Sequence, residues 1–278
     1  MVRTGLRAAC LAGGLVLGAG AALAAPQRVV SINLCTDQLA LQLAAPGQLV
    51  SVSYLAHDPA SSAMAAEAAA LPANRGTAEE VFLLRPDLVL AGAFTAPDTL
   101  RLLERLGARV VLFQPETSLQ DIRDNTRLMG RVLGREHEAE ALLARFDAGL
   151  AALPDIPARR PGAIIYGANG YVAGPDSLAG AILDAAGYRN LAADFGIAQG
   201  GTLPLEQLVL ARPDLVVLGS RHAGHSRSED MLDHPALRAL LGRQPQSVIE
   251  DRGWVCGTPH VLDAIRALSA ARLHGKPA

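Results

Sequence analysis

The chain has 278 residues, half of them hydrophobic, with 25 basic and 27 acidic side chains and a net charge of −2. So mild a charge provides no electrostatic surface for nucleic acid or for an anionic membrane, and we expect neither partner. The hydrophobic half is large enough to build one large core or two moderate ones.

The first 24 residues predict a secretory signal peptide. Arg3 and Arg7 form a basic start, a hydrophobic run follows over residues 11–23, and residues 22–24 (Ala-Leu-Ala) are a typical cleavage site. The run is too short to span a bilayer. We therefore expect cleavage after Ala24 and a soluble, exported product. Loss of the two arginines lowers the basic count from 25 to 23 against 27 acidic residues, so the mature chain carries −4.

Strand and helix patterns alternate in the region that follows. Hydrophobic runs predict strands over residues 28–33, 48–53 and 109–113, and helical spacing covers residues 36–44 and 98–106. Such alternation is typical of a parallel sheet wrapped by helices. We assign residues 25–116 to a first α/β lobe.

The motif Arg-Pro-Asp-Leu-Val occurs twice, 127 residues apart. In each copy, over residues 79–90 and 206–217, a short hydrophobic helix ends before a proline, which cannot continue it. A run of Leu and Val then predicts a strand that is covered on both faces. A duplicated unit of this length indicates two similar α/β lobes, and two lobes enclose a cleft where we expect the functional site.

The segment between the two copies of the motif predicts a long connection. It opens on a capping box, Ser118 to Asp121, and contains no proline up to residue 153. A continuous helix of this length would measure roughly 50 Å, although Gly130 and Gly134 could bend or divide it. We assign residues 117–153 to one connecting helix.

Residues 154–278 form the second predicted lobe. Three prolines begin this region, and the same alternation of patterns follows. The predicted strands cover residues 162–168, 213–219 and 247–256, and the predicted helices cover residues 174–186, 204–211, 229–241 and 259–272.

Four features occur together in the mature chain: the opening Arg-Val-Val-Ser strand at residues 28–31, both copies of the repeated motif, the proline-free helix, and Gly-Pro-Asp-Ser-Leu at residues 174–178. With these features the chain resembles the class III periplasmic substrate-binding proteins of ABC importers, which handle ferric siderophores, haem, cobalamin and some metal ions. The resemblance covers essentially all of the mature chain. It implies an α/β fold of two Rossmann-like lobes with mostly parallel sheets, joined by one long α-helix. It also implies a monomeric binding protein without catalysis, cofactor or resident metal.

The resemblance implies how the protein docks. In this family, an exposed glutamate on each lobe engages arginines of the membrane permease, and the matching positions are Glu79 and Glu206. Charge pairs of this kind steer encounter and set orientation. The alternative is that each glutamate lies in the first turn of a helix and simply favours the helix dipole.

The side chains that bind cargo are expected in loops beyond the carboxyl ends of the strands. Arginines suit anionic chelates, because the guanidinium forms bidentate hydrogen bonds with carboxylates. The only tryptophan could stack on a ring, or it could pack in the core below the last helix. The residues that we expect to bind the ligand are Asn33, Cys35, Tyr54, Phe94, Tyr166, Tyr171, Arg221, His222, Arg227, Trp254 and His260.

The predicted cargo is an iron chelate, either a ferric siderophore or a haem-like complex, delivered to an ABC permease in the inner membrane. Cobalamin is the first alternative, although relatives that bind it wall the cleft with several tryptophans and residues 73–74 and 199–200 hold no aromatic. A bare metal ion held by His57, His222, His225 and His260, with Cys35 and Cys256, is a further alternative. An exported enzyme is another, but no nucleophile-elbow or phosphate-loop motif is present.

Cys35 and Cys256 remain after export. Cys35 follows the first strand of one lobe, and Cys256 follows the last strand of the other. A disulfide is possible in an oxidising compartment, but it would lock the lobes together if both loops faced the cleft. We therefore favour two small, partly buried thiols and leave the disulfide as the alternative.

Overall fold

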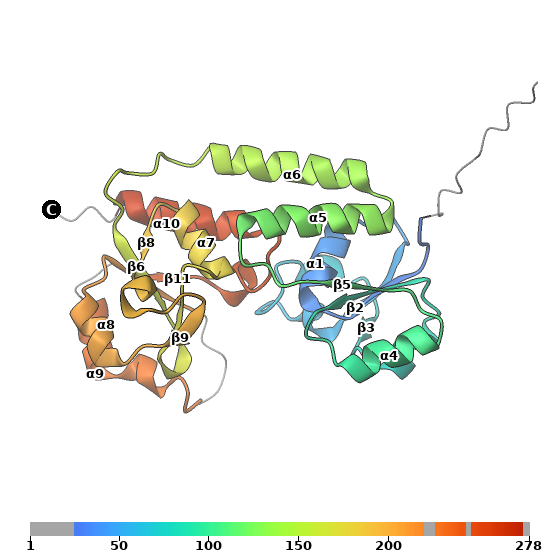
Figure 1. Cartoon of the computed structure of the whole chain (residues 1–278), viewed down its shortest axis with the longest axis horizontal. Helices are drawn as coiled ribbons and strands as arrows, with labels where there is room; N and C mark the ends of the chain where they lie inside the picture. Colours follow the sequence, from blue (N-terminus) through green and yellow to red (C-terminus); the bar gives the residue numbers. More distant parts are fainter. Residues whose placement is uncertain (1–24, 220–225, 243–245, 275–278) are drawn as a thin grey trace, which may run out of the picture.

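Two α/β lobes lie side by side in the computed structural model, which describes residues 25–219, 226–242 and 246–274 (Figure 1). The signal peptide predicted over residues 1–24 lies outside these ranges. Within them, every helix is too short or too polar to span a bilayer.

The amino-terminal lobe contains a five-stranded sheet in the order β3-β2-β1-β4-β5, and all four pairings are parallel. This confirms the expected parallel sheet. Its core gathers apolar side chains of the central strands and of α1. The elements are β1 (Val29–Ser31), α1 (Leu34–Leu43), β2 (Leu49–Ser53), η1 (Tyr54–His57), α2 (Ala65–Ala68), β3 (Ala73–Asn74), α3 (Ala78–Leu83), β4 (Leu88–Gly92), α4 (Pro97–Arg105) and β5 (Val110–Phe113).

The carboxyl-terminal lobe contains a mixed sheet in the order β11-β10-β6-β7-β9, with β8 beside β6. Strands β6, β8, β10 and β11 pair in parallel, whereas β7 and β9 are antiparallel. The elements are β6 (Gly162–Tyr166), η2 (Ala168–Gly170), β7 (Tyr171–Ala173), α7 (Leu178–Ala185), β8 (Arg189–Asn190), η3 (Leu191–Phe195), β9 (Gly200–Thr202), α8 (Leu205–Ala211), β10 (Leu215–Leu218), η4 (Asp230–Asp233), α9 (Pro235–Leu241), β11 (Gln246–Val248), η5 (Asp251–Gly253) and α10 (Val261–His274).

Two predicted elements of this lobe are shorter than expected. The helix predicted over residues 229–241 is divided into η4 and α9, because Pro235 disfavours helical backbone at the residue before it. The strand predicted over residues 247–256 ends at Val248, and η5 follows. Both differences place irregular backbone at the edge of the cleft.

The repeated motif has the same structural role in both lobes. The carboxylate of Asp87 accepts a hydrogen bond from the backbone N–H of Arg28 at 3.0 Å, and that of Asp214 accepts one from Gly162 at 2.6 Å. Each aspartate thereby ties the start of its own strand to the start of the neighbouring central strand. The repeat therefore encodes a strand junction that is needed once in each lobe.

The connection between the lobes differs from the single helix expected over residues 117–153. It consists of two helices that lie side by side, α5 (Leu119–Leu133) and α6 (Glu136–Ala151) (Figure 1). Gly134 ends α5 in the left-handed conformation, with φ of 69°, which a glycine adopts without steric cost. Each helix is about 23 Å long at 1.5 Å per residue.

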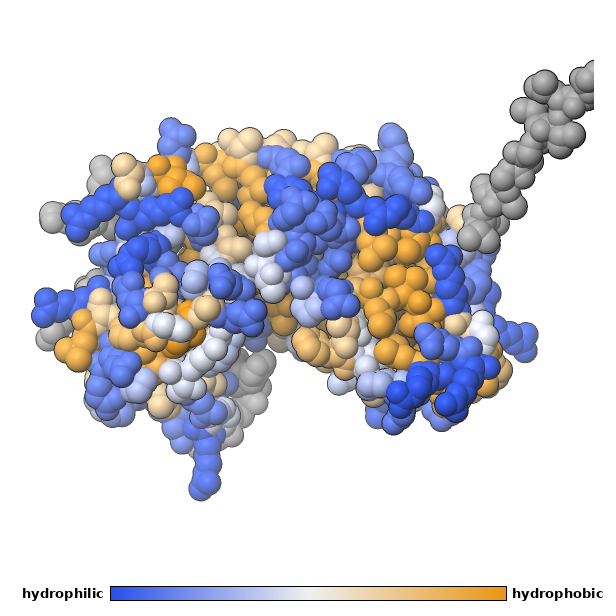
Figure 2. All heavy atoms as spheres, viewed as in Figure 1, coloured by the Kyte–Doolittle hydropathy of each residue, from blue (hydrophilic) through white to orange (hydrophobic). Residues whose placement is uncertain are grey.

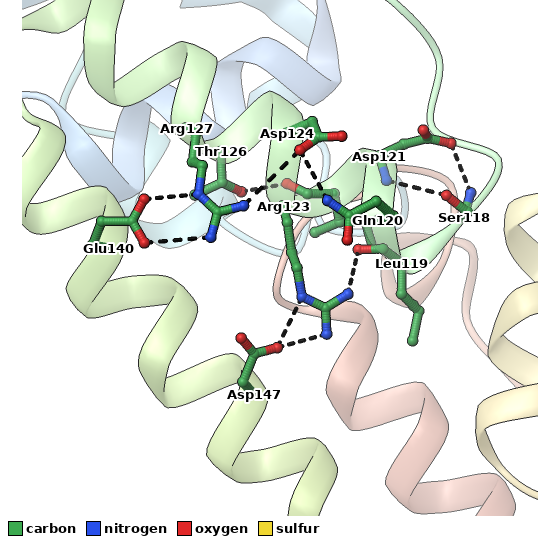
Figure 3. A network of polar contacts seen from close by, with 11 residues as sticks. Ser118, Leu119, Gln120, Asp121, Arg123, Asp124, Thr126, Arg127, Glu140 and Asp147 are labelled. Carbon is green, nitrogen blue, oxygen red and sulfur yellow. Dashed lines mark hydrogen bonds and ion pairs between the residues drawn. The ribbon is translucent and has the colours of Figure 1, made fainter.

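Ion pairs join the two helices along their exposed faces (Figure 3). Arg127 contacts Glu140 at 2.8 Å, and Arg123 contacts Asp147 at 2.6 Å. The capping box predicted at Ser118 is confirmed, since its hydroxyl accepts the Asp121 N–H at 3.1 Å. These polar contacts fix how the helices lie against each other.

The helical hairpin still spans both lobes, as the single helix would have done. At its open end, Ile122 and Phe146 pack in the carboxyl-terminal core. At its closed end, Met129, Leu133 and Leu142 pack in the amino-terminal core. The hairpin therefore braces the two lobes along one side, and the outline of the molecule is notched between them on the opposite side (Figure 2).

Candidate functional site

A cavity of about 640 Å³ lies between the lobes. Its size falls within the ordinary range for small-molecule binding sites. Most of its lining follows the carboxyl ends of parallel strands, where ligands collect in α/β sheets. The amino-terminal lobe contributes Asn33, Cys35, Phe94, Phe113 and Glu116 to the lining. The carboxyl-terminal lobe contributes Ile165, Tyr171, Ser177, Glu229, Leu232, Asp251, Trp254 and Val255.

Five of the predicted ligand-binding residues are brought together at this cavity: Asn33, Cys35, Phe94, Tyr171 and Trp254. The side chains of Phe94 and Tyr171 are 88% and 51% exposed, so their rings are free to contact a ligand. Trp254 lines the cavity and also packs against the core of its own lobe. Trp254 thus packs on the core, as one interpretation had it, and stacking on a ligand stays a prediction.

Asn33 has a structural role at the edge of the cavity. Its side-chain oxygen accepts hydrogen bonds from the backbone N–H groups of Cys35, at 3.0 Å, and Thr36, at 3.3 Å. It is the N-cap of α1. The predicted ligand residue thus fixes the helix that carries Cys35.

Tyr166 does not line the cavity, which corrects the expectation from the sequence. Its ring is completely buried in a hydrophobic cluster of the carboxyl-terminal lobe, and its hydroxyl donates to the carbonyl of Leu203 at 3.3 Å. Tyr166 is the last residue of β6, where side chains alternate between the two faces of the sheet. Its side chain belongs to the face opposite the one that Ile165 presents to the cavity.

The remaining predicted ligand residues also lie away from the cavity lining or outside the described residues. Tyr54, in η1, is exposed at another place on the amino-terminal lobe, and Arg227 is exposed beyond the lining. His260 precedes α10 and is half-buried, also outside the lining. Arg221 and His222 fall outside the residues that the structure describes.

Three carboxylates of the lining were not predicted: Glu116, Glu229 and Asp251. Glu116 accepts a hydrogen bond from the amide of Asn125 at 2.5 Å, and burial raises the pKa of its carboxyl. It follows the carboxyl end of β5, so the strand-end rule that nominated the other loops applies here too. We missed it because that strand was interpreted only as the end of the lobe.

Within the described residues, the charged side chains that line the cavity differ from the expected arginines and histidines. Among its described lining residues, Glu116, Glu229 and Asp251 are acidic, and none is a lysine, arginine or histidine. The rest of the lining is aromatic, aliphatic or uncharged. Carboxylates repel anionic groups and accept hydrogen bonds from N–H donors.

The described residues contain no group of three or more His, Cys, Asp and Glu side chains that could hold a metal ion. The histidines that the metal-ion alternative required are distributed elsewhere. His57 lies in η1, His260 precedes α10, and His222 and His225 fall outside the described ranges. The geometry thus provides no ligand set for a bare ion within those ranges.

A disulfide joins Cys35 to Cys256, whereas the sequence favoured two thiols. The argument against the bond was that it would link the lobes if both loops faced the cleft. Both loops do face it, and the bond links the start of α1 to the loop before α10.

The two predicted docking residues are exposed. Glu79 lies in the first turn of α3, and Glu206 lies in the first turn of α8, so the repeat places them at equivalent positions in the two lobes. Glu79 also lines a second hollow, of about 640 Å³, which shares Asn33 and Phe94 with the cavity.

The sequence and the fold match known proteins. The profile of the family described as "Periplasmic binding protein" matches residues 29–241. The chain belongs to this family. The members of this family are described as periplasmic binding proteins.

Two cobalamin-binding proteins, from two strains of Halobacterium salinarum, are 31% identical to the chain over 232 residues. The match covers 81% of this chain and 60% of theirs, so the chain spans less than two thirds of these relatives. The apo periplasmic heme-binding protein RhuT of Roseiflexus sp. RS-1 has the same fold, with a TM-score of 0.74, 24% identity, and coverage of 90% of this chain and 98% of that one. A periplasmic heme-binding protein of Pseudomonas aeruginosa aligns with a TM-score of 0.65, 26% identity, and coverage of 88% and 92%.

Proposed function

We propose that this protein is the receptor of an ABC importer and that its cargo is a corrinoid of the cobalamin type. The receptor would take up its cargo in the periplasm, after removal of residues 1–24, and deliver it to the permease. The observation that supports this cargo is the cavity itself, which combines aromatic side chains with three carboxylates and, among its described lining, no cation.

The chemistry of a corrinoid suits this lining. A corrin carries a rim of primary amides, whose N–H groups are the donors that carboxylates accept. Glu116, Glu229 and Asp251 provide such acceptors on both sides of the cleft. Trp254 and Tyr171 offer flat surfaces for the macrocycle, since aromatic rings contact other large apolar groups favourably. The cobalamin-binding relatives, at 31% identity, support the same choice.

The iron chelates that the sequence favoured suit the lining less well. Catecholate and carboxylate siderophores are anionic, as are the propionates of haem, and they would face three carboxylates. The two arginines that we expected to receive them are not part of the described lining, since Arg227 lies outside it and Arg221 outside the described ranges.

Haem is the second candidate, because one residue favours it. Tyr171 lines the cavity with a half-exposed ring, and a tyrosine oxygen is a known axial ligand of haem iron. The fold shared with heme-binding proteins is compatible with this choice.

A thermal-shift screen distinguishes the two candidates. The mature protein is tested with cyanocobalamin, haemin, and one catecholate and one hydroxamate ferric siderophore. A ligand at a hundred times its dissociation constant adds about 2.7 kcal/mol to the free energy of unfolding. We expect cyanocobalamin alone to stabilise the protein. Glu229→Gln should lower the affinity for cyanocobalamin at least tenfold, whereas Glu104→Gln, on the exposed face of α4, should leave the affinity unchanged. Stabilisation by haemin without cyanocobalamin, lost in Tyr171→Phe, would replace the first candidate by the second.

A further inference from the structure

A short segment of the carboxyl-terminal lobe, residues 254–257, is attached to the amino-terminal lobe at two neighbouring points. We call it the clasp segment. It follows η5 and precedes α10, whose Val261 and Ile265 lie in the core of the carboxyl-terminal lobe. The chain on both sides of the segment thus belongs to one lobe, whereas its attachments lie in the other.

The first attachment is the disulfide between Cys256 and Cys35. Cys256 is buried, and Cys35 lies in the first turn of α1 at the wall of the cavity. The start of α1 is itself rigid, because Asn33 caps it and β1 precedes it in the centre of the sheet. The bond therefore anchors the clasp segment to a fixed element.

The second attachment is Glu116, directly beyond β5. A Cβ atom on Gly257 would lie 2.3 Å from the Cβ of Glu116, so the two segments of the chain are in direct contact. The amide of Asn125 in α5 donates a hydrogen bond to the Glu116 carboxylate at 2.5 Å. Asn125 of the hairpin thus fixes the Glu116 side chain, and Glu116 in turn packs against the clasp segment.

The other two residues of the clasp segment, Trp254 and Val255, form part of the cavity wall. We propose that the Cys35–Cys256 disulfide and Glu116 act as positioning residues, which hold Trp254 and Val255 at the cavity wall before cargo arrives. Binding then does not have to order this wall. Pre-organisation of this kind raises affinity, because the cost of immobilising side chains has already been met in the free protein.

Trp254 makes the proposal testable without any cargo, because it is the only tryptophan of the chain. The exported, oxidised protein is compared with the same protein in dithiothreitol, with the double variant Cys35→Ser/Cys256→Ser, and with Glu116→Ala. Glu104→Ala is the matched control, a glutamate in exposed helix α4. The measurements are acrylamide quenching of tryptophan fluorescence and hydrogen exchange of residues 250–258.

We expect the quenching constant and the exchange rate to rise about twofold or more on reduction and in both variants, because a released segment exposes its side chains to solvent. The double variant should no longer respond to dithiothreitol, and Glu104→Ala should match the wild type. Far-ultraviolet circular dichroism checks that each protein remains folded. If the double variant does not fold, reduction of the wild type and Glu116→Ala test the same prediction.

An affinity measurement completes the test, and this part rests on the proposed function. Calorimetric titration with cyanocobalamin should give a dissociation constant about tenfold higher for the reduced protein and for both variants than for the oxidised wild type. If no form of the protein binds cyanocobalamin but the fluorescence changes occur, the proposed cargo is wrong and the proposal about the clasp segment stands. Unchanged quenching and exchange on reduction, or two free thiols titrated in the exported protein, would overturn the clasp.

Discussion

Asp37 is a buried carboxylate in the first turn of α1, two residues beyond Cys35. Its oxygens accept hydrogen bonds from the backbone N–H of Ser53 at 3.1 and 3.2 Å and from the Ser53 hydroxyl. Burial, which these hydrogen bonds only partly offset, raises the pKa of Asp37 from 3.8 to about 6. The charged carboxylate therefore weakens the folded state at neutral pH.

The pH dependence of stability follows from this shift. The folded state binds the proton of Asp37 more tightly than the unfolded state, so its stabilising effect is complete below pH 3.8 and is lost as the pH rises through about 6. One pKa unit corresponds to about 1.4 kcal/mol, so the effect is on the order of 3 kcal/mol. We expect the free energy of unfolding of Asp37→Asn, relative to the wild type, to rise by most of this amount, about 2 kcal/mol, between pH 4 and pH 7 in urea titrations. A difference that does not vary with pH would show that Asp37 titrates normally.

Among the elements, the α5–α6 hairpin depends on one close approach. A Cβ atom on Gly130 of α5 would lie 2.6 Å from the Cβ of Ala139 in α6, a distance that real side chains do not adopt. Only a glycine allows the two helices to lie at this separation. The ion pairs of Arg127 and Arg123 with α6 depend on the same arrangement.

We therefore expect Gly130→Ala to lower the free energy of unfolding. Overpacking costs typically 1–3 kcal/mol, and the better helix propensity of alanine returns about 1 kcal/mol, so the net loss should be roughly 0–2 kcal/mol. The matched control is Gly242→Ala, at the end of α9, where a Cβ would meet no atom closer than 3.4 Å and φ is −71°. Equal stability of the two variants in urea titrations would mean that the hairpin can widen without cost.

At the scale of the whole molecule, the two lobes present equivalent surfaces to a partner. Glu79 and Glu206 are exposed at the same position of the repeat, and Leu83 and Leu210, one helical turn further on, are 78% and 79% exposed. Each lobe thus exposes an apolar side chain next to a charged one. Such a pair of surfaces matches a partner that also has two equivalent binding sites. We propose that this pair of surfaces docks on the permease.

Reversal of both charges tests the docking proposal. The double variant Glu79→Lys/Glu206→Lys should abolish uptake of labelled cargo by cells and leave the dissociation constant of the purified protein unchanged, because interfacial charges govern encounter and orientation. Glu67→Lys/Glu104→Lys, an equal change of charge at exposed positions, is the control. A higher dissociation constant for the Glu79→Lys/Glu206→Lys variant would instead show that Glu79 contacts the cargo, since it lines the hollow beside the cavity.

Much of the fold could be predicted because the information is local. Hydrophobic periodicity located most strands and helices to within a few residues, and the repeated motif indicated two lobes, since Asp87 and Asp214 each make the same backbone contact within their own lobe. The strand-end rule then placed Asn33, Phe94 and Tyr171 at the cavity. Each of these inferences needs only the residues near it in the chain.

What the sequence alone did not determine depends on contacts between distant segments. Nothing near Tyr166 shows which face of β6 turns toward the cavity, nothing near Cys35 shows that Cys256 lies within bonding distance, and nothing near Glu116 shows that Gly257 packs on it. The packing of the chain decides all three, because it buries Tyr166 against other segments of its own lobe and brings the other two pairs together across more than a hundred residues. The composition of the cavity, on which the proposed cargo rests, was decided at that level.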